Sequence, residues 1–265
     1  MNPGVEKVRG HSDSTLGLVL GGGAVLGAAH IGVLQALDEA GVEVTHLAGT
    51  SMGALVGALY AFGLSGKEIE ALAGELRWPD ITRFFPSRLG LLSMDRLESL
   101  FHRHLGRVKM EDARIPVALV ATDIASGEKV VMKTGDLATA ATASACVPGL
   151  FIPVEREGRL LVDGGLLENL PVSPLKEWGV ENIVAVDVHM GRRFHRPRNL
   201  PELLSNALDM ALANAATGYA EDADVLITPD TTSWSRAEMQ DVPALVREGY
   251  RAARERLFPG SHSPG

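Results

Sequence analysis

The chain has 265 residues, of which 46% are hydrophobic and 22% are charged, and its formal net charge at pH 7 is −8. This length and apolar content suffice for one α/β domain with a sizeable core, and the acidic balance argues against a nucleic-acid-binding protein, whose surface should be basic. The single cysteine, Cys146, excludes an intramolecular disulfide framework. We expect it to be a small buried side chain in a reducing compartment.

The sequence shows no targeting or membrane-spanning segment. The first 13 residues have no apolar core of the secretory kind, and no run of about 18 uninterrupted apolar residues follows. We therefore expect a cytoplasmic protein, for which attachment to the surface of a membrane stays open. The expected domain covers residues 14–258, and flexible tails are expected at residues 1–13 and 259–265.

Two strand–helix units are predicted in the first 65 residues. An apolar run over residues 16–20 predicts a buried strand, and apolar side chains at helical spacing over residues 28–40 predict a helix. A second strand over residues 42–48 and a second helix over residues 51–62 repeat the pattern. This alternation implies right-handed crossovers and a parallel sheet.

The remaining elements continue this α/β pattern without an internal repeat or a linker. Later helices are expected at residues 65–76, 93–105, 137–146, 201–216 and 242–257. Later strands are expected at residues 115–122, 130–133, 160–162, 183–188 and 225–228.

Large apolar side chains are concentrated between Trp78 and Leu92, among two prolines and a glycine. Two interpretations of this segment stay open. It is either a lid over an apolar pocket or a peripheral helical insertion.

A Gly-x-Ser-x-Gly pattern spans Gly49, Ser51 and Gly53, between the second strand and the second helix. A serine on such a sharp turn exposes its hydroxyl, and the two glycines let neighbouring backbone pass close by. The helix N-terminus also favours developing negative charge. The pattern predicts that Ser51 is a nucleophile, and the alternative is a serine that only caps the helix.

A nucleophilic serine needs a base, and Asp163 is the first candidate. It ends an apolar strand and precedes Gly164 and Gly165, although an Asp-Gly pair also forms simple turns. A second scheme adds His189, which follows the strand predicted at residues 183–188. The order Ser51, Asp163, His189 is the order of an α/β-hydrolase triad.

Oxyanion donors are expected from the consecutive small residues Gly21, Gly22, Gly23 and Ala24, whose N–H groups lie at the start of a helix. A dinucleotide-binding loop is disfavoured because position 26 is Leu26 instead of glycine. A phosphate-binding P-loop is disfavoured too, since its Gly-Lys-Ser/Thr ending is missing. A bound nucleotide is therefore not expected.

Four blocks of residues occur in a characteristic order. They are Gly21–Gly27 with Ala28–Leu34, Gly49–Gly53, Ala143–Gly149, and Asp163–Gly165 through Asn169–Val172. Together they resemble the patatin-like phospholipases, specifically the small bacterial single-domain members. The resemblance covers about residues 16–257.

This resemblance implies a three-layer α/β/α sandwich with a mostly parallel sheet. It implies a Ser51–Asp163 dyad without histidine, a glycine loop that supplies the oxyanion hole, and a covalent acyl-Ser51 intermediate formed from a lipid or another carboxylic ester. It implies no cofactor and no metal. The expected partner is thus a lipid or ester substrate, with peripheral membrane contact allowed, and the acidic charge argues against nucleic acid. The motif glycines of these blocks are Gly27, Gly49, Gly53, Gly164 and Gly165.

The chain departs from the family pattern in the glycine block. Ala24 stands where a glycine belongs, and Leu26 stands where the family usually has arginine or lysine. The loss of a cation beside the oxyanion weakens the expectation of phospholipid specificity more than that of esterase chemistry. A non-catalytic lipid-binding or regulatory protein of the same fold therefore stays an alternative.

A basic cluster stands out in this acidic chain: Arg192, Arg193, His195, Arg196 and Arg198. Such a cluster is either a solvated loop or a contact for anionic lipid head groups.

Overall fold

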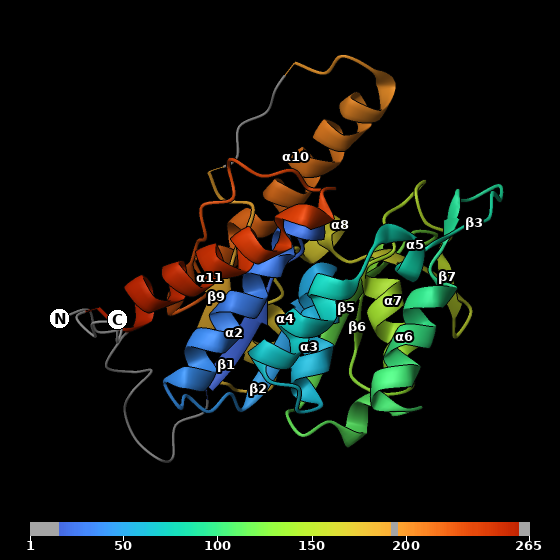
Figure 1. The fold of residues 1–265 in the computed structure, drawn as a ribbon. Coiled ribbons are helices and arrows are strands. Elements are labelled where there is room, and N and C mark those ends of the chain that lie inside the picture. The colour runs from blue at the N-terminus through green and yellow to red at the C-terminus, as the bar shows by residue number, and fades with distance from the viewer. Residues whose placement is uncertain (1–15, 192–195, 260–265) are drawn as a thin grey trace.

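The computed structural model describes residues 16–191 and 196–259. In it a mixed β-sheet is covered by helices on both faces (Figure 1). Except for Pro259, the tails expected at residues 1–13 and 259–265 lie outside the described residues.

The main sheet has eight strands. They are β1 (Leu16–Leu20), β2 (His46–Thr50), β5 (Val117–Asp123), β6 (Glu128–Met132), β7 (Val154–Arg156), β8 (Arg159–Asp163), β9 (Asn182–Val186) and β10 (Val225–Ile227). A separate two-stranded sheet consists of β3 (Arg83–Phe84) and β4 (Leu92–Ser93).

The described helices are of two kinds. The α-helices are α2 (Ala29–Glu39), α3 (Met52–Ala61), α4 (Gly66–Glu75), α5 (Trp78–Ile81), α6 (Asp95–Leu105), α7 (Leu137–Ser144), α8 (Gly165–Glu168), α9 (Ser173–Glu177), α10 (Leu200–Ala220) and α11 (Val242–Leu257). The 3-10 helices are η1 (Ala24–Ala28), η2 (Met110–Asp112) and η3 (Met239–Asp241).

The order of strands in the main sheet is β10–β9–β1–β2–β5–β8–β7, and β6 pairs with β5 outside this path. Strands β10, β9, β1, β2 and β5 are parallel, whereas β6, β7 and β8 run antiparallel to their neighbours. The predicted fold class, an α/β/α sandwich with a mostly parallel sheet, is therefore confirmed. Ligands of such sheets bind beyond the carboxyl ends of the parallel strands.

One edge of β5 is shared by two strands that meet end to end. Thr50 of β2 pairs with Val120, and Asp163 of β8 pairs with the next residue, Ala121. Both of these β5 residues also pair with β6, which therefore occupies the opposite edge. Because β8 runs antiparallel, its last residue arrives where β2 ends and Ser51 begins the next helix.

The hydrophobic core lies on both faces of the sheet. Successive strand side chains point to opposite faces, so Leu18 and Leu20 belong to a large cluster with helices α2, α3 and α11. Val19 and Ala48 belong to a smaller cluster with α9 and the end of α10. This burial on both faces explains why the central strands β1 and β9 are almost entirely apolar.

The strand predicted at residues 42–48 was placed wrongly at its start, since β2 begins at His46. Gly41 has a φ of 64°, and the N–H of Val42 donates to the Leu37 carbonyl. These features end α2 in a left-handed turn. The residues that follow form a connection to the sheet.

Most other predicted elements are present with shifted ends. The helix predicted from Ser93 begins at Asp95, because Ser93 belongs to β4 and its hydroxyl accepts a hydrogen bond from the Asp95 N–H. Helix α7 ends at Ser144, two residues early, and α10 extends to Ala220. The elements β3, β4, β7, α5, α8 and α9 were not predicted, because two to five residues carry little periodicity.

Among the described helices, none combines the length and apolar composition needed to cross a lipid bilayer.

Candidate active site

Ser51 lies on a strained turn between β2 and α3. Its backbone has φ 54° and ψ −123°, a conformation rare for a residue with a side chain. The Ser51 N–H donates to the hydroxyl of Ser144, which in turn donates to the Val120 carbonyl. The buried Ser144 therefore fixes the turn to strand β5, and the strain is supported by the surrounding structure.

The motif glycines next to Ser51 are required by close backbone approach. A Cβ atom at Gly53 would collide with the carbonyl oxygen of Leu20, and one at Gly49 would collide with backbone atoms of Gly53 and Ala54. Helix α3 can therefore begin directly above β1 and β2 only with glycine at these positions.

Ser51 and Asp163 are in direct contact. The Ser51 hydroxyl donates to Oδ2 of Asp163 at 2.6 Å, and both residues are buried. The other carboxylate oxygen, Oδ1, accepts the N–H of Gly165 at 2.8 Å. The backbone thus holds the carboxylate with one oxygen turned toward Ser51.

Burial raises the pKa of Asp163 above its ordinary value of 3.8, because the charged form loses hydration. The hydrogen bonds from Ser51 and Gly165 lower this pKa, as does the positive charge of Arg236. A carboxylate with a raised pKa is a stronger base than an exposed aspartate.

His189 is buried near the glycine loop, with other partners than the Ser51–Asp163 pair. The backbone N–H of His189 donates to the Asp187 carboxylate. Its ring Nδ1 lies 3.4 Å from the side-chain nitrogen of Asn169. The described hydrogen bonds of the Ser51 and Asp163 side chains do not include His189.

The glycine loop lies directly beside Ser51. A Cβ atom at Gly22 would be 3.1 Å from Cβ of Ser51. The N–H of Gly21 donates to Val186 and that of Gly22 to Asn169, both through backbone carbonyls. Within the described part of the chain, the N–H groups of Gly23 and Ala24 have no such acceptor.

The His30 side chain is hydrogen-bonded to the glycine loop. Its Nε2–H donates to the Gly21 carbonyl at 2.7 Å, and burial lowers the pKa of His30 to about 4. The ring is therefore neutral at physiological pH and acts as a structural donor.

Leu26, which replaces the expected basic residue, is completely buried in the core. A cation nevertheless lies near the site. The backbone carbonyl of Arg236 accepts the N–H of Val25, and its guanidinium forms an ion pair with Asp209 of α10. Arg236 therefore connects η1 with α10.

Ser144 and Arg236 were not predicted as site residues. Ser144 belongs to the block Ala143–Gly149, in which it was assigned no role in the site, and Arg236 lies in a loop without a motif. Only their contacts with Ser51 and Val25 reveal them.

The remaining expectations concern metals, the thiol and the basic cluster. Among residues 16–191 and 196–259, no group of three or more His, Cys, Asp or Glu side chains could hold a metal ion. Cys146 is buried, and burial raises the pKa of its thiol to about 12. Arg192, Arg193 and His195 lie outside the described residues, whereas Arg196 is exposed.

Several known proteins are similar to this chain in sequence. A family model described as patatin-like phospholipase matches residues 18–176. An uncharacterised NTE family protein of Mycobacterium tuberculosis is 37% identical over 190 residues, which cover 71% of this chain and 52% of that protein. Lysophospholipase NTE1 of Pyricularia oryzae is 36% identical over 183 residues, which cover 66% of this chain and 12% of that protein.

Among solved structures, VipD from Legionella pneumophila has a similar fold. The TM-score is 0.55 at 15% sequence identity, and the similarity covers 92% of this chain and 66% of that one. The match to the Mycobacterium relative spans about half of that protein's length.

Proposed function

The chain belongs to the patatin-like phospholipase family, and from this premise we propose that it hydrolyses acyl esters of lipids with Ser51 as nucleophile and Asp163 as base. The observation that carries the proposal is the 2.6 Å hydrogen bond from the Ser51 hydroxyl to the buried Asp163 carboxylate. The name of the Pyricularia relative, a lysophospholipase, supports a lipid ester as the substrate.

In the proposed reaction, Asp163 Oδ2 takes the proton of the Ser51 hydroxyl while Oγ attacks the ester carbonyl carbon. The C–O bond to the alcohol then breaks, and the alcohol leaves with that proton. Water, deprotonated by Asp163, attacks the acyl-Ser51 ester and releases the carboxylic acid. Asp163 then transfers the proton that it took from water to Oγ of Ser51.

We assign the oxyanion donors to the N–H groups of Gly23 and Ala24. Of the four candidates in this loop, these two keep their N–H groups available, whereas Gly21 and Gly22 already donate to backbone carbonyls. Ala24 has a φ of 49°, which turns consecutive amides of the loop in a way typical of anion-binding backbone. Fixed donors of this kind stabilise the negative charge that develops in acyl transfer.

The proposal is tested first by covalent labelling. We expect a fluorophosphonate probe to label the purified protein at Ser51, and the purified protein to hydrolyse members of a panel of phospholipids, lysolipids, acylglycerols and simple esters. If the folded protein neither reacts with the probe nor turns over any ester, the alternative of a non-catalytic lipid-binding protein is favoured instead.

The pH dependence should report the Asp163 carboxylate. Because the base must be deprotonated and its pKa is raised, kcat/KM should fall on the acid side at a pH above 3.8. Arg236→Gln removes a positive charge that lowers this pKa, so the acid limb should move to higher pH. Arg251→Gln is the matched control, since Arg251 pairs with Glu248 and Glu255 on the surface of α11.

The measurement is kcat/KM for a soluble ester across the acid range, for the wild type and both variants. An acid limb that stays in place in Arg236→Gln would contradict the assignment of Asp163 as the titrating base.

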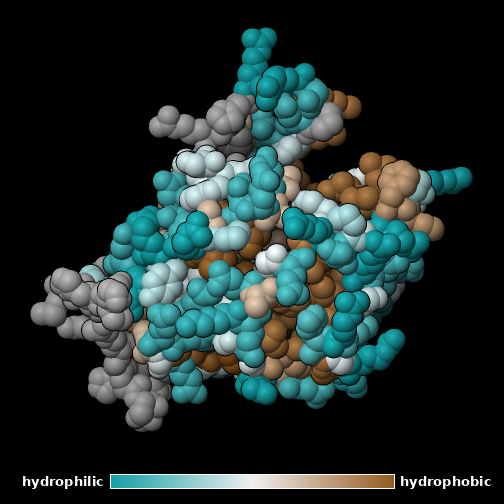
Figure 2. Space-filling view, in the orientation of Figure 1, coloured by the Kyte–Doolittle hydropathy of each residue, from teal (hydrophilic) through white to brown (hydrophobic). Residues whose placement is uncertain are grey.

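Peripheral contact with a lipid surface is the second part of the proposal. Phe84 and Phe85 in the β3–β4 segment are 73% and 52% exposed, and Leu203 and Leu204 near the start of α10 are 51% and 60% exposed. Both segments project from the sheet (Figure 1), and Figure 2 shows hydrophobic side chains gathered on the projection that carries β3. Exposed aromatic and leucine side chains suit insertion among lipid head groups, and the exposed Arg88 follows Phe85 by three residues in the chain.

We expect the double variant Phe84→Ser with Phe85→Ser to bind phosphatidylcholine vesicles at least about tenfold more weakly, since each aromatic ring contributes roughly 1.5–3 kcal/mol when buried. Hydrolysis of a water-soluble ester should be unchanged. Glu43→Ser, at an exposed site before β2, is the control. Vesicle co-sedimentation measures the effect, and equal binding by all three proteins would refute a contact through this projection.

A further inference from the structure

Helix α3, which begins directly after Ser51, is apolar on nearly all sides and must be covered on both faces. One face packs on the sheet, where a Cβ atom at Gly57 would collide with Leu47 of β2. The opposite face contributes Met52, Leu55 and Leu59 to a cavity beneath helices α4 and α6.

The cavity has a volume of about 90 Å³ and is lined by apolar side chains alone. Protein interiors contain few voids larger than a water molecule, and an apolar void of this kind stays dry and accepts apolar ligands. The chemistry of its walls therefore selects a hydrocarbon group.

One end of this cavity lies beside the proposed active site. Met52 directly follows Ser51 in the chain, and Val25 directly follows Ala24 of the glycine loop. From Met52 the lining residues of α3 recur at each turn as far as Leu59, a distance of about 10 Å along the helix axis. The cavity therefore continues along the apolar face of α3 from the residue that follows Ser51.

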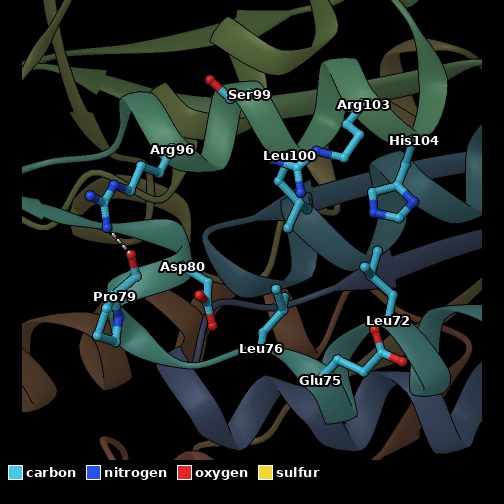
Figure 3. Close-up of a pocket in the computed structure, with 10 residues that line it drawn as sticks. All are labelled: Leu72, Glu75, Leu76, Pro79, Asp80, Arg96, Ser99, Leu100, Arg103 and His104. Carbon is cyan, nitrogen blue, oxygen red and sulfur yellow. Dashed lines mark hydrogen bonds between the residues drawn. The ribbon is translucent and has the colours of Figure 1, made fainter.

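The other end is closed by leucines. Leu72 and Leu76 of α4 and Leu100 of α6 line the cavity and also line a second, outer pocket of about 570 Å³. Figure 3 shows these three side chains between the two helices, with charged groups such as Arg96 and Arg103 around them. The leucines thus form a thin wall between an apolar cavity and a polar pocket.

We propose that the cavity binds the part of the substrate acyl chain next to the ester carbonyl, and that the wall of Leu72, Leu76 and Leu100 sets the chain-length preference. This inference rests on the proposed function. Each methylene group that enters the cavity leaves water and strengthens binding. Methylene groups beyond the wall must separate the leucines and enter charged surroundings.

The test is a series of soluble p-nitrophenyl esters of increasing acyl length. For the wild type, kcat/KM should rise with each added carbon, reach a maximum, and fall beyond it. Ala73→Phe fills the cavity from α4 and should shift the maximum to shorter chains, with a loss of about tenfold for the chain that is best in the wild type. Ala71→Phe, on the exposed side of the same helix, is the matched control and should leave the profile unchanged.

A second variant works in the opposite direction. Leu72→Ala opens the wall, and the maximum should move to longer chains. If both Ala73→Phe and Leu72→Ala fold, as judged by circular dichroism, and keep the wild-type maximum, the cavity is not the acyl site. Failure of the proposed function is a separate result, because Ser51→Ala would then still hydrolyse these esters.

Discussion

Replacing Ser51 by alanine is expected to lower kcat for ester hydrolysis by about 10⁶-fold, the scale seen when a serine nucleophile is removed. Without Oγ no acyl-enzyme can form, and Asp163 has no serine hydroxyl to deprotonate. Only binding and the oxyanion donors remain to act on the substrate. The measurement is turnover of a soluble ester, together with loss of fluorophosphonate labelling.

The matched control is Ser65→Ala, which also tests whether Ser51 is only a helix cap. Ser65 is a true N-cap, whose hydroxyl accepts the Glu68 N–H, whereas the Ser51 side chain makes no such bond. We expect Ser65→Ala to lower the free energy of unfolding by about 1 kcal/mol and keep full activity. Ser51→Ala should leave the free energy of unfolding nearly unchanged and abolish most of the activity. Retained turnover in Ser51→Ala would exclude Ser51 as the nucleophile.

Asp163→Asn is expected to lower kcat by about 10⁴-fold, comparable to the effect of replacing the buried aspartate of a serine protease triad by asparagine. The amide has nearly the same shape as the carboxylate, although its single oxygen can accept only one of the two donors, the Ser51 hydroxyl or the Gly165 N–H. It is, however, far too weak a base to accept the serine proton. The loss should therefore appear in turnover with little change in folding.

Two further variants make this experiment specific. Asp123→Asn changes a carboxylate at the end of β5 that accepts hydrogen bonds within its own turn, from Ser126 and Ala125, and should retain activity. His189→Ala distinguishes the dyad from a triad. A dyad predicts nearly full activity, whereas a loss of several orders of magnitude would indicate that His189 takes part in the proton transfer.

Local features of the fold were predictable because neighbouring residues encode them. The helices expected over residues 65–76 and 242–257 are both present, and the first begins with a Ser65–Glu68 capping box. Elements of two to five residues, such as β3 and α9, were missed because they are too short to show a periodic pattern of apolar residues.

The pattern around Ser51 was also local and could be recognised from neighbouring residues alone. Gly49, Ser51 and Gly53 lie within one strand-to-helix turn, and the structure shows the strained backbone and close contacts that such a pattern requires. Asp163 was a candidate for a similar reason, since it ends a strand before two glycines.

The contact between these groups depends on the three-dimensional arrangement of the sheet. Ser51 and Asp163 are 112 residues apart, and they touch because β2 and the antiparallel β8 share one edge of β5 and end at adjacent residues, Val120 and Ala121. Strand register and direction follow from the packing of the whole sheet, which no local pattern specifies. Three other features also depend on the packing of the whole domain: the available amides of the glycine loop, the position of the Arg236 charge near Asp163, and the apolar cavity beside Met52.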